Sequence, residues 1–390
     1  MVWKKFYKKG KKEKKEKVAK KDKGTLVNAK NMKPIDKNSN EKIYIMPLGG
    51  IGEVGKNLTL FKCRDEIVIL DVGFTFPTDD MLGVDLVIPD FSYIESNKDK
   101  IKGIAVTHGH LDHIGALPYL YNKIDNKIPM FGSKLAMELA KSKFKENNDV
   151  SKYNFREVQN RSKVRVGKYF EIEFIRVTHS IADAFAVAIH TPSGTILHTG
   201  DFKIDLTPVD NKPFDFYKFA QLGEDGVLLL LSDSTNAERE GFTPPEKGVG
   251  VSIKDSFEKA KGRIVIASFS SHIHRLQQII NVTHAAGRKF AVEGRSMKEM
   301  VKIASDMGYL KIPEGAKVNL RKIKNLKDEE VVLLCTGTQG EPMAALSRMA
   351  NGEHRHIEIR EKDTVIISAT PIPGNEKSVY RNINKLLKTK

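Results

Sequence analysis

The chain has 390 residues, of which 40% are hydrophobic and 29% are charged. This is the composition of a folded protein that is long enough for two domains. No apolar run approaches the roughly 18 residues of a membrane span, so no membrane span is predicted. The two cysteines, Cys63 and Cys335, lie far apart in separate apolar runs. Buried thiols in a reducing compartment are predicted rather than a disulfide, which favours a cytoplasmic protein.

The positive charge is concentrated at the N-terminus. Residues 1–40 hold fifteen Lys against four acidic residues, a net charge of +11, which leaves +5 of the total +16 for the other 350 residues. Because this tail has no apolar stretch to bury, residues 1–41 are predicted to be disordered, and no secretory signal is predicted. The tail either adds affinity for phosphate backbones through counterion release or acts as a solubilising extension, and both readings stay open.

Residues 42–240 contain short apolar runs of strand length separated by helical patterns. The turn Ser193-Gly194 indicates an antiparallel pair, and Ser133 is placed to cap a helix. Sheets covered by helices are therefore expected. Strands are predicted at 43–48, 67–70, 104–106, 171–177, 184–191, 195–199 and 227–231, and helices at 113–121 and 133–145.

From about residue 241 onward, strands and helices alternate regularly. This alternation is typical of a doubly wound α/β unit. No internal repeat is found. Strands are predicted at 263–269, 289–292, 331–335 and 364–368, and helices at 274–286, 296–307, 342–350 and 377–387.

The segment Gly50–Gly55 matches the G-x-G-x-x-G pattern of a dinucleotide site directly after a predicted strand. Such a site requires a helix immediately after the glycines. Residues 56–61 instead have the pattern of another strand. We therefore interpret the segment as a glycine-rich hairpin that lines the cleft.

The densest chemical signal is the segment Thr107–His113, which follows a predicted strand. Imidazole nitrogens and carboxylate oxygens are the ligands that zinc and manganese take, and three histidines and an aspartate so close together fit poorly in a core without a metal. The segment predicts a catalytic metal site. Its candidate ligands are His108, His110, Asp112 and His113.

Two later strand ends offer further ligands. His179 follows the strand predicted at 171–177, and Asp201 follows another strand, with Gly200 permitting close backbone approach. Alone, each would be read as a solvated or capping residue. Their order after the histidine-rich loop makes both of them candidate ligands.

This order resembles the metallo-β-lactamase superfamily, in which an H-x-H-x-D-H loop is followed by a later His and a later Asp. From about residue 43 to its end, the chain further resembles the ribonuclease J family, bacterial RNA-decay nucleases of the β-CASP branch. The segments that carry this second resemblance are Leu70–Phe74, Met81–Asp85, Ser232–Glu238, Ser271–Arg275 and Gly337–Ala344.

The resemblance implies two Zn²⁺ or Mn²⁺ ions per active site. His108, His110 and His179 would hold the first ion. Asp112 and His113 would begin the second site, and Asp201 would bridge the two ions. Asp71 would orient the ligand loop without touching an ion.

The resemblance also implies how RNA would be bound and cut. A hydroxide activated by two metals would attack the phosphodiester, and the catalytic residues would be Asp112, Asp201, Asp233 and His274. Of His272 and His274, we favour His274 because the family's histidine precedes Arg. RNA or its phosphates would contact Gly337, Thr338, Gln339, Gly340, Glu341 and Ser368.

The fold implied is α/β: an αββα metallo-β-lactamase sandwich, in its N-terminal part at 42–240, with an inserted doubly wound β-CASP domain at 241–390. Family members combine 5′-to-3′ exonuclease and endonuclease action on single-stranded RNA in RNA decay and maturation. The full-length form is expected to be a homodimer or a heteromer with a ribonuclease J homologue. No membrane partner is expected.

The chain departs from the family pattern near its end. The family's H-x-S-G-H and P-x-H-G-E stretches are missing, and no His follows His356. The resemblance therefore implies that the second metal site lacks its last His ligand and that the sandwich is incomplete, with an open edge. These 390 residues are not expected to cut RNA unaided.

Two other functions compete with the nuclease. One is an inactive RNA-binding or partner subunit of a full-length homologue, and the other is a hydrolase of lactones or thioesters. The motifs around Asp233 and His274 and the inserted α/β domain argue against the second.

Overall fold

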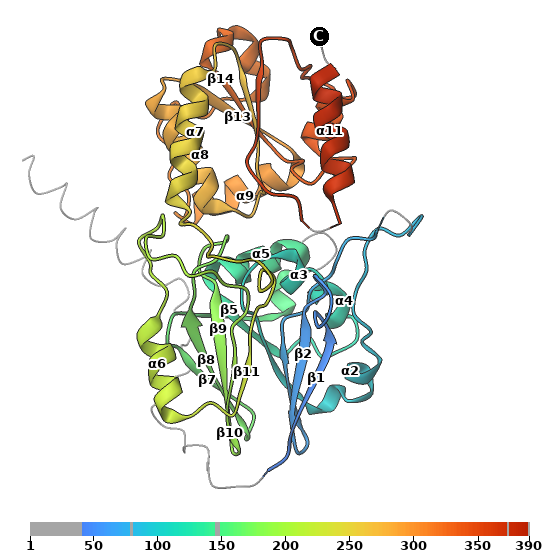
Figure 1. Ribbon diagram of the computed structural model, residues 1–390. Coiled ribbons are helices and arrows are strands. Elements are labelled where there is room, and N and C mark those ends of the chain that lie inside the picture. Colours follow the sequence, from blue (N-terminus) through green and yellow to red (C-terminus); the bar gives the residue numbers. More distant parts are fainter. Residues whose placement is uncertain (1–40, 79–80, 145–148, 373, 389–390) are drawn as a thin grey trace, which may run out of the picture.

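The computed structural model describes residues 41–78, 81–144, 149–372 and 374–388. Two halves are stacked one above the other: the sandwich half, residues 41–231, and the parallel-sheet half, residues 247–388 (Figure 1). Of the predicted Lys-rich tail, residues 1–41, all but Glu41 lie outside the described residues. Within the ranges described, no helix is long and apolar enough to cross a bilayer.

The sandwich half contains two sheets. Strands β1 to β3 pair antiparallel, and β3 to β6 pair parallel. The six-stranded sheet has the order β1 (Ile43–Gly49), β2 (Leu58–Cys63), β3 (Glu66–Leu70), β4 (Ile101–Ala105), β5 (Pro129–Ser133) and β6 (Asn154–Val158). The five-stranded sheet has the order β11 (Leu229–Leu231), β10 (Gly194–His198), β9 (Phe185–Thr191), β8 (Phe170–Arg176) and β7 (Lys163–Val166).

Alternation along the strands builds four layers. Leu60 and Ile69 pack on the helical side of the six-stranded sheet, whereas Phe61 and Val68 face the other sheet. Buried residues between the sheets include Phe174 of β8. The helices of the sandwich half are α2 (Ser92–Ser96), α3 (Leu111–Ile114), α4 (Leu117–Tyr121) and α5 (Lys134–Phe144) on one side and α6 (Phe216–Asp225) on the other. This arrangement confirms the αββα sandwich.

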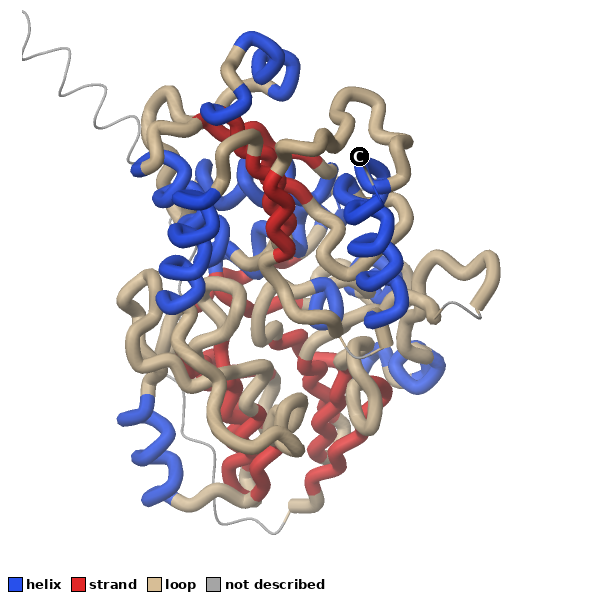
Figure 2. Tube along the Cα trace, turned by 45° about the horizontal axis from the view of Figure 1, so that its top comes forward, coloured by secondary structure: helices blue, strands red, loops and turns tan. Residues whose placement is uncertain are grey.

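The parallel-sheet half is a doubly wound unit, as predicted. Its sheet is entirely parallel, with the order β13 (Lys289–Glu293), β14 (Val331–Cys335), β12 (Ile264–Ala267) and β15 (Thr364–Ile367). Ile264 and Ile266 pack toward one helical layer, and Val265 packs toward the other. Figure 2 shows helices on both sides of these strands. They are α7 (Lys247–Lys259), α8 (Ile273–Ala285), α9 (Arg295–Asp306), α10 (Ala345–Ala350) and α11 (Glu376–Lys388).

The structure also corrects some local predictions. The helix predicted at 113–121 is two short helices, α3 and α4, because the backbone N–H of Ala116 bonds to the carbonyl of Val72 instead of continuing the first helix. Strands β5 to β7 and helices α2, α6 and α7 were not predicted. The glycine-rich segment is followed by β2 and not by a helix, which confirms the strand predicted after it.

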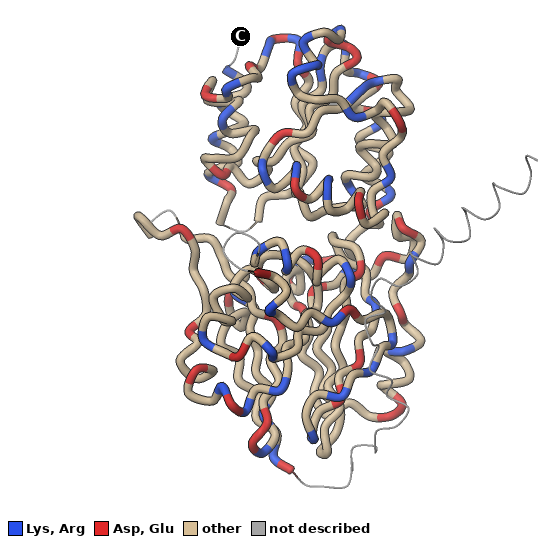
Figure 3. Tube along the Cα trace, turned by 180° about the vertical axis from the view of Figure 1, so that it is seen from behind, with Lys and Arg blue, Asp and Glu red and all other residues tan. Residues whose placement is uncertain are grey.

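Charged side chains are mixed over both halves. Figure 3 shows Lys and Arg interspersed with Asp and Glu across the described chain. This distribution agrees with the small net charge of the chain beyond its tail.

Candidate metal centre

The histidine-rich loop lies where β4 ends, and tight backbone contacts set its course. The carbonyl of Thr107 accepts from the N–H of Phe185 in β9 at 2.9 Å, which ties the loop to the second sheet. The carbonyl of His113 accepts from the N–H of Val72 at 2.7 Å. A Cβ atom on Gly73 would lie 1.5 Å from the carbonyl oxygen of Asp112, so only glycine fits beside this turn.

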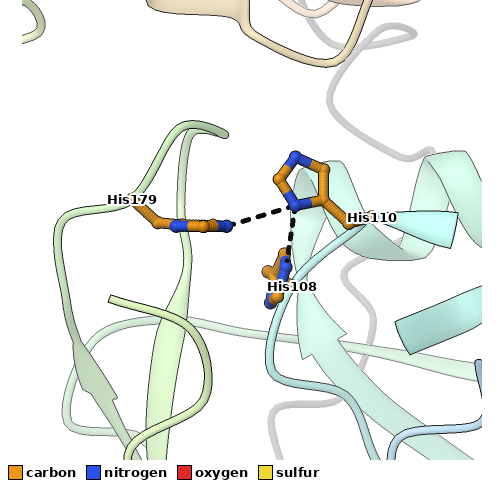
Figure 4. A group of neighbouring side chains, drawn as sticks. All are labelled: His108, His110 and His179. Atoms are coloured by element: carbon orange, nitrogen blue, oxygen red, sulfur yellow. Dashed lines mark hydrogen bonds between the residues drawn. The ribbon is translucent and has the colours of Figure 1, made fainter. Parts of the chain in front are cut away.

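Three of the predicted ligands converge in one cluster. The Nδ1 of His110 lies 3.0 Å from the Nε2 of His108 and 3.2 Å from the Nε2 of His179. Figure 4 shows His108 and His110 leaving the same loop while His179 approaches from the end of a separate strand. Their nitrogens all lie within 4.8 Å of one another, so this group could hold a metal ion.

Electrostatics keep these imidazoles neutral. Burial, helped by the neighbouring His charge, lowers the pKa of His110 to about 3. Burial likewise lowers the pKa of His179 to about 4 and that of His108 well below its ordinary value. Neutral imidazoles keep a lone pair for a metal ion. The donor set therefore fits Zn²⁺ or Mn²⁺.

A second group adjoins the first and shares His108. The nitrogens of His108 and His113 and a carboxylate oxygen of Asp201 also lie within 4.8 Å of one another. The Nε2 of His113 is 3.4 Å from Asp201 and 3.5 Å from Asp112. Burial raises the pKa of Asp201, but the adjacent His113 charge and hydrogen bond outweigh it, so the net pKa is lowered.

Asp71 lies beneath this second group in a left-handed backbone conformation, with φ of 56°. Its carboxylate accepts from the N–H and hydroxyl of Thr107, both at 2.8 Å, and contacts the Nδ1 of His113 at 2.8 Å. Because a carboxylate can only accept, His113 donates from Nδ1. Its Nε2 is then the nitrogen that faces Asp112 and Asp201.

The residues predicted to face the scissile phosphate lie around this cluster. Asp233 adjoins the Asp201 loop, since it accepts from the N–H of Phe202 at 3.3 Å. His274 lines a small cavity together with His179, and its Nε2 is 4.0 Å from Asp210. Burial first, and then the charge of the neighbouring Arg275, lowers the pKa of His272 well below its ordinary value.

The predicted phosphate loop divides into two parts. Gly337, Thr338 and Glu341 line a cavity of about 580 Å³. The buried side chain of Gln339 instead accepts from the N–H of Ile372 at 2.7 Å and donates to the carbonyl of Thr370, so it braces a neighbouring loop. Neither Gly340 nor Ser368 lines this cavity. Ser368 accepts from the guanidinium of Arg275 through its hydroxyl and its carbonyl, both at 2.9 Å.

Sequence reasoning missed several residues that the fold brings to these sites. Arg295 and Arg348 line the larger cavity beside His354. Asn57 contacts both Asp112 and His113. The one available signal was position, because Arg295 comes two residues after a parallel strand and Asn57 comes two residues after the glycine-rich segment.

Comparison with known proteins agrees with this geometry. Residues 51–223 match the profile of the metallo-β-lactamase superfamily, and residues 261–386 match that of the ribonuclease J β-CASP domain. The fold also resembles the crystal structure of a protein of unknown function from Enterococcus faecalis, with a TM-score of 0.58, 14% sequence identity and coverage of 88% of this chain and 92% of that one. The molecule is thus a metallo-β-lactamase-fold protein with a β-CASP domain.

Similar proteins narrow the assignment of this chain from the superfamily to one family within it. The chain is 48% identical over 347 residues to ribonuclease J of Synechocystis, which covers 89% of this chain and 54% of the relative. It is 47% identical to ribonuclease J of Helicobacter pylori J99, covering 90% and 50%, and 45% identical to that of Thermus thermophilus, covering 89% and 61%. The chain belongs to the ribonuclease J family. It spans about half the length of the first of these relatives.

Proposed function

We propose that the chain carries the catalytic site of a metal-dependent ribonuclease that hydrolyses single-stranded RNA, by 5′-to-3′ exonuclease and endonuclease action, in RNA decay and maturation. The observation that carries this proposal is the convergence of His108, His110 and His179 beside His113 and Asp201. Family membership supports the same reading. The relatives are longer than this chain, so the ribonuclease activity of the whole protein is proposed for this chain and not inferred from its similarity alone.

The proposed ligands divide between two ions. His108, His110 and His179 would hold the first, Asp112 and His113 the second, and Asp201 would contact both. Two divalent ions so held would activate a water molecule and stabilise negative charge on the phosphate. The neutral histidines supply lone pairs, and Asp71 keeps the ring of His113 turned so that its Nε2 faces the site.

RNA would be bound and oriented by residues of the seam between the two halves. Arg295 and Arg348 line the larger cavity, where their guanidinium groups would hold phosphate oxygens. Asp233 and His274 would face the scissile phosphate. The backbone N–H groups near Gly337 and Thr338 would complete the contact with the RNA backbone.

The cellular setting is part of the same proposal. Cys63 and Cys335 are both buried and unpaired, which suits the reducing cytoplasm. The partners proposed are single-stranded RNA and, in a full-length form, a second copy or a ribonuclease J homologue.

The test is hydrolysis of a 5′-monophosphorylated, 3′-labelled single-stranded RNA with Zn²⁺ or Mn²⁺, with Asp112→Ala as the control. Cleavage that needs the metal and disappears in the variant would show that the ligands present here suffice, contrary to the expectation that these 390 residues do not cut RNA unaided. A folded chain that leaves RNA intact, yet binds it without metal and with steep salt dependence, would support the partner-subunit alternative instead.

A further inference from the structure

The glycine-rich segment ends beside Asn57, whose side chain reaches the turn that carries Asp112 and His113. Its Nδ2 lies 3.1 Å from the carbonyl oxygen of Asp112, 3.4 Å from the Oδ2 of Asp112 and 3.1 Å from the Nε2 of His113. The backbone N–H of Asn57 donates to the same Asp112 carbonyl at 3.0 Å. One side-chain amide thus touches both residues assigned above to the second ion.

Glycines on either side make this contact possible. Gly50 has φ of +85°, and a Cβ there would lie 2.5 Å from the Oδ1 of Asn57. A Cβ on Gly73 would collide with the carbonyl of Asp112. We therefore interpret the glycines of Gly50–Gly55 as residues that let the side-chain amide of Asn57 lie close to the turn formed by Asp112 and His113.

We propose that Asn57 is a positioning residue that sets the affinity of the second metal subsite; this inference rests on the proposed function. The Asn57 NH₂ group is a donor and not a metal ligand, so it acts through its neighbours. Asp71 holds the Nδ1 of His113, and the Asn57 amide lies against the Nε2, a contact that opens when an ion takes that nitrogen. The same amide holds the Asp112 peptide and reaches toward its carboxylate, so the aspartate is already oriented before an ion binds.

This support matters most at the second subsite. The first ion has three converging imidazoles, whereas the second relies on Asp112, His113 and the shared Asp201. Residues that orient metal ligands typically change metal affinity by about 10–100-fold when they are removed. An effect confined to one ion separates this role from a general loss of folding.

The experiment is a stepwise Zn²⁺ titration by calorimetry, with bound metal counted after dialysis. Asn57→Ala is compared with the wild-type chain and with Asn97→Ala, a matched control whose Nδ2 donates to the Tyr93 carbonyl at 2.9 Å in helix α2. We expect Asn57→Ala to weaken the second binding step by about 10–100-fold and leave the first unchanged. The control should alter neither step.

Asn57→Asp adds a second readout. Its carboxylate would face the oxygens of Asp112, so repulsion should lower the melting temperature without metal, and Zn²⁺ should raise it more than in the wild type. An equal loss of melting temperature with and without Zn²⁺, or equal weakening of both binding steps, would overturn the inference. So would a wild-type chain that binds one ion only. A wild type that binds no ion would overturn the proposed function itself.

Discussion

Single side chains decide the geometry of the metal centre. Asp71 accepts three hydrogen bonds, from the N–H and hydroxyl of Thr107 and from His113. The aspartate was predicted as an orienting residue, and this contact with His113 is consistent with that role. Because three donors face the carboxylate of Asp71, a side chain at position 71 that carries a donor of its own would meet one of them unfavourably.

We therefore expect Asp71→Asn to weaken Zn²⁺ binding by about 10–100-fold, because the amide NH₂ must face at least one of these donors. It should also cost about 1–3 kcal/mol of stability by leaving a buried donor unsatisfied. Metal titration and denaturant unfolding measure the two effects. The exposed Asp90→Asn is the control, and equal metal affinity in the two variants would contradict the expectation.

Gly73 is the second residue-scale constraint, since its Cα adjoins the Asp112 carbonyl. Gly73→Ala should displace the Asp112 turn and destabilise the chain by about 1–3 kcal/mol through overpacking. Gly223→Ala is the matched control, because nothing lies within 4 Å of a Cβ at this position in α6. This control should be neutral or stabilise by about 0.5–1 kcal/mol. Similar unfolding midpoints for the two variants would refute the steric argument.

At the scale of elements, α6 covers the outer face of the five-stranded sheet and begins at a strongly bound carboxylate. Asp215 accepts from the Nε and Nη2 of Arg161 at 2.8 and 2.7 Å and from the N–H of Lys218 at 3.3 Å. The hydrogen bond from Arg161 is the main cause that lowers the pKa of Asp215 to about 2. Both contacts help to anchor the start of the helix.

The sign of the pH dependence follows from this lowered pKa. The stabilisation is fully present above the ordinary pKa of 3.8 and is lost as the pH falls toward 2. Asp215→Asn should therefore lower the melting temperature at pH 7, and its difference from the wild type should shrink below about pH 4. Melting curves across this range, with Asp225→Asn of the same helix as control, test it. A difference that does not change with pH would count against the ion pair.

At the scale of the whole molecule, a buried ion cluster aligns the two halves. Glu246 lies just before α7, and its carboxylate accepts a hydrogen bond from the Nη2 of Arg275 at 3.0 Å. The backbone N–H of Glu246 donates to the carboxylate of Asp205, in the sandwich half, at 3.0 Å. The Nζ of Lys203 lies 3.7 Å from the carboxylate of Glu246. Because Lys203 follows Asp201 by two residues, this cluster places the metal centre against the helix that carries His274.

The edge strand β11 is the second feature at this scale. Among the residues that the structure describes, it pairs with β10 alone; Leu230 in the strand and Leu228 just before it are 55% and 58% exposed. An apolar edge of this kind favours association between molecules. Leu230→Lys should reduce light scattering at high concentration with little change in melting temperature. Leu387→Lys, at a site 78% exposed in α11, is the control. If Leu230→Lys scatters light as strongly as the wild type, association through the edge of β11 is contradicted.

Local patterns account for most of what could be predicted. The apolar run at β14 and the alternation after residue 241 follow from burial along a strand or helix, which nearby residues determine. The short helices α3 and α4 could not be foreseen, because a hydrogen bond from Ala116 to the distant Val72 interrupts the expected single helix. Long-range backbone contacts of this kind leave no periodic signal.

The sequence by itself determined the chemistry of this protein: the types of ligand, their order along the chain and the strand ends from which they project. Only the tertiary structure decided which atoms meet. It brought the amide of Asn57 to His113 and the side chain of Gln339 into a hydrogen bond with the backbone of Ile372. It also placed Arg295 and Arg348 along one cavity. The physical reason is that ligand identity is a property of each residue, whereas convergence depends on packing between segments far apart in the chain.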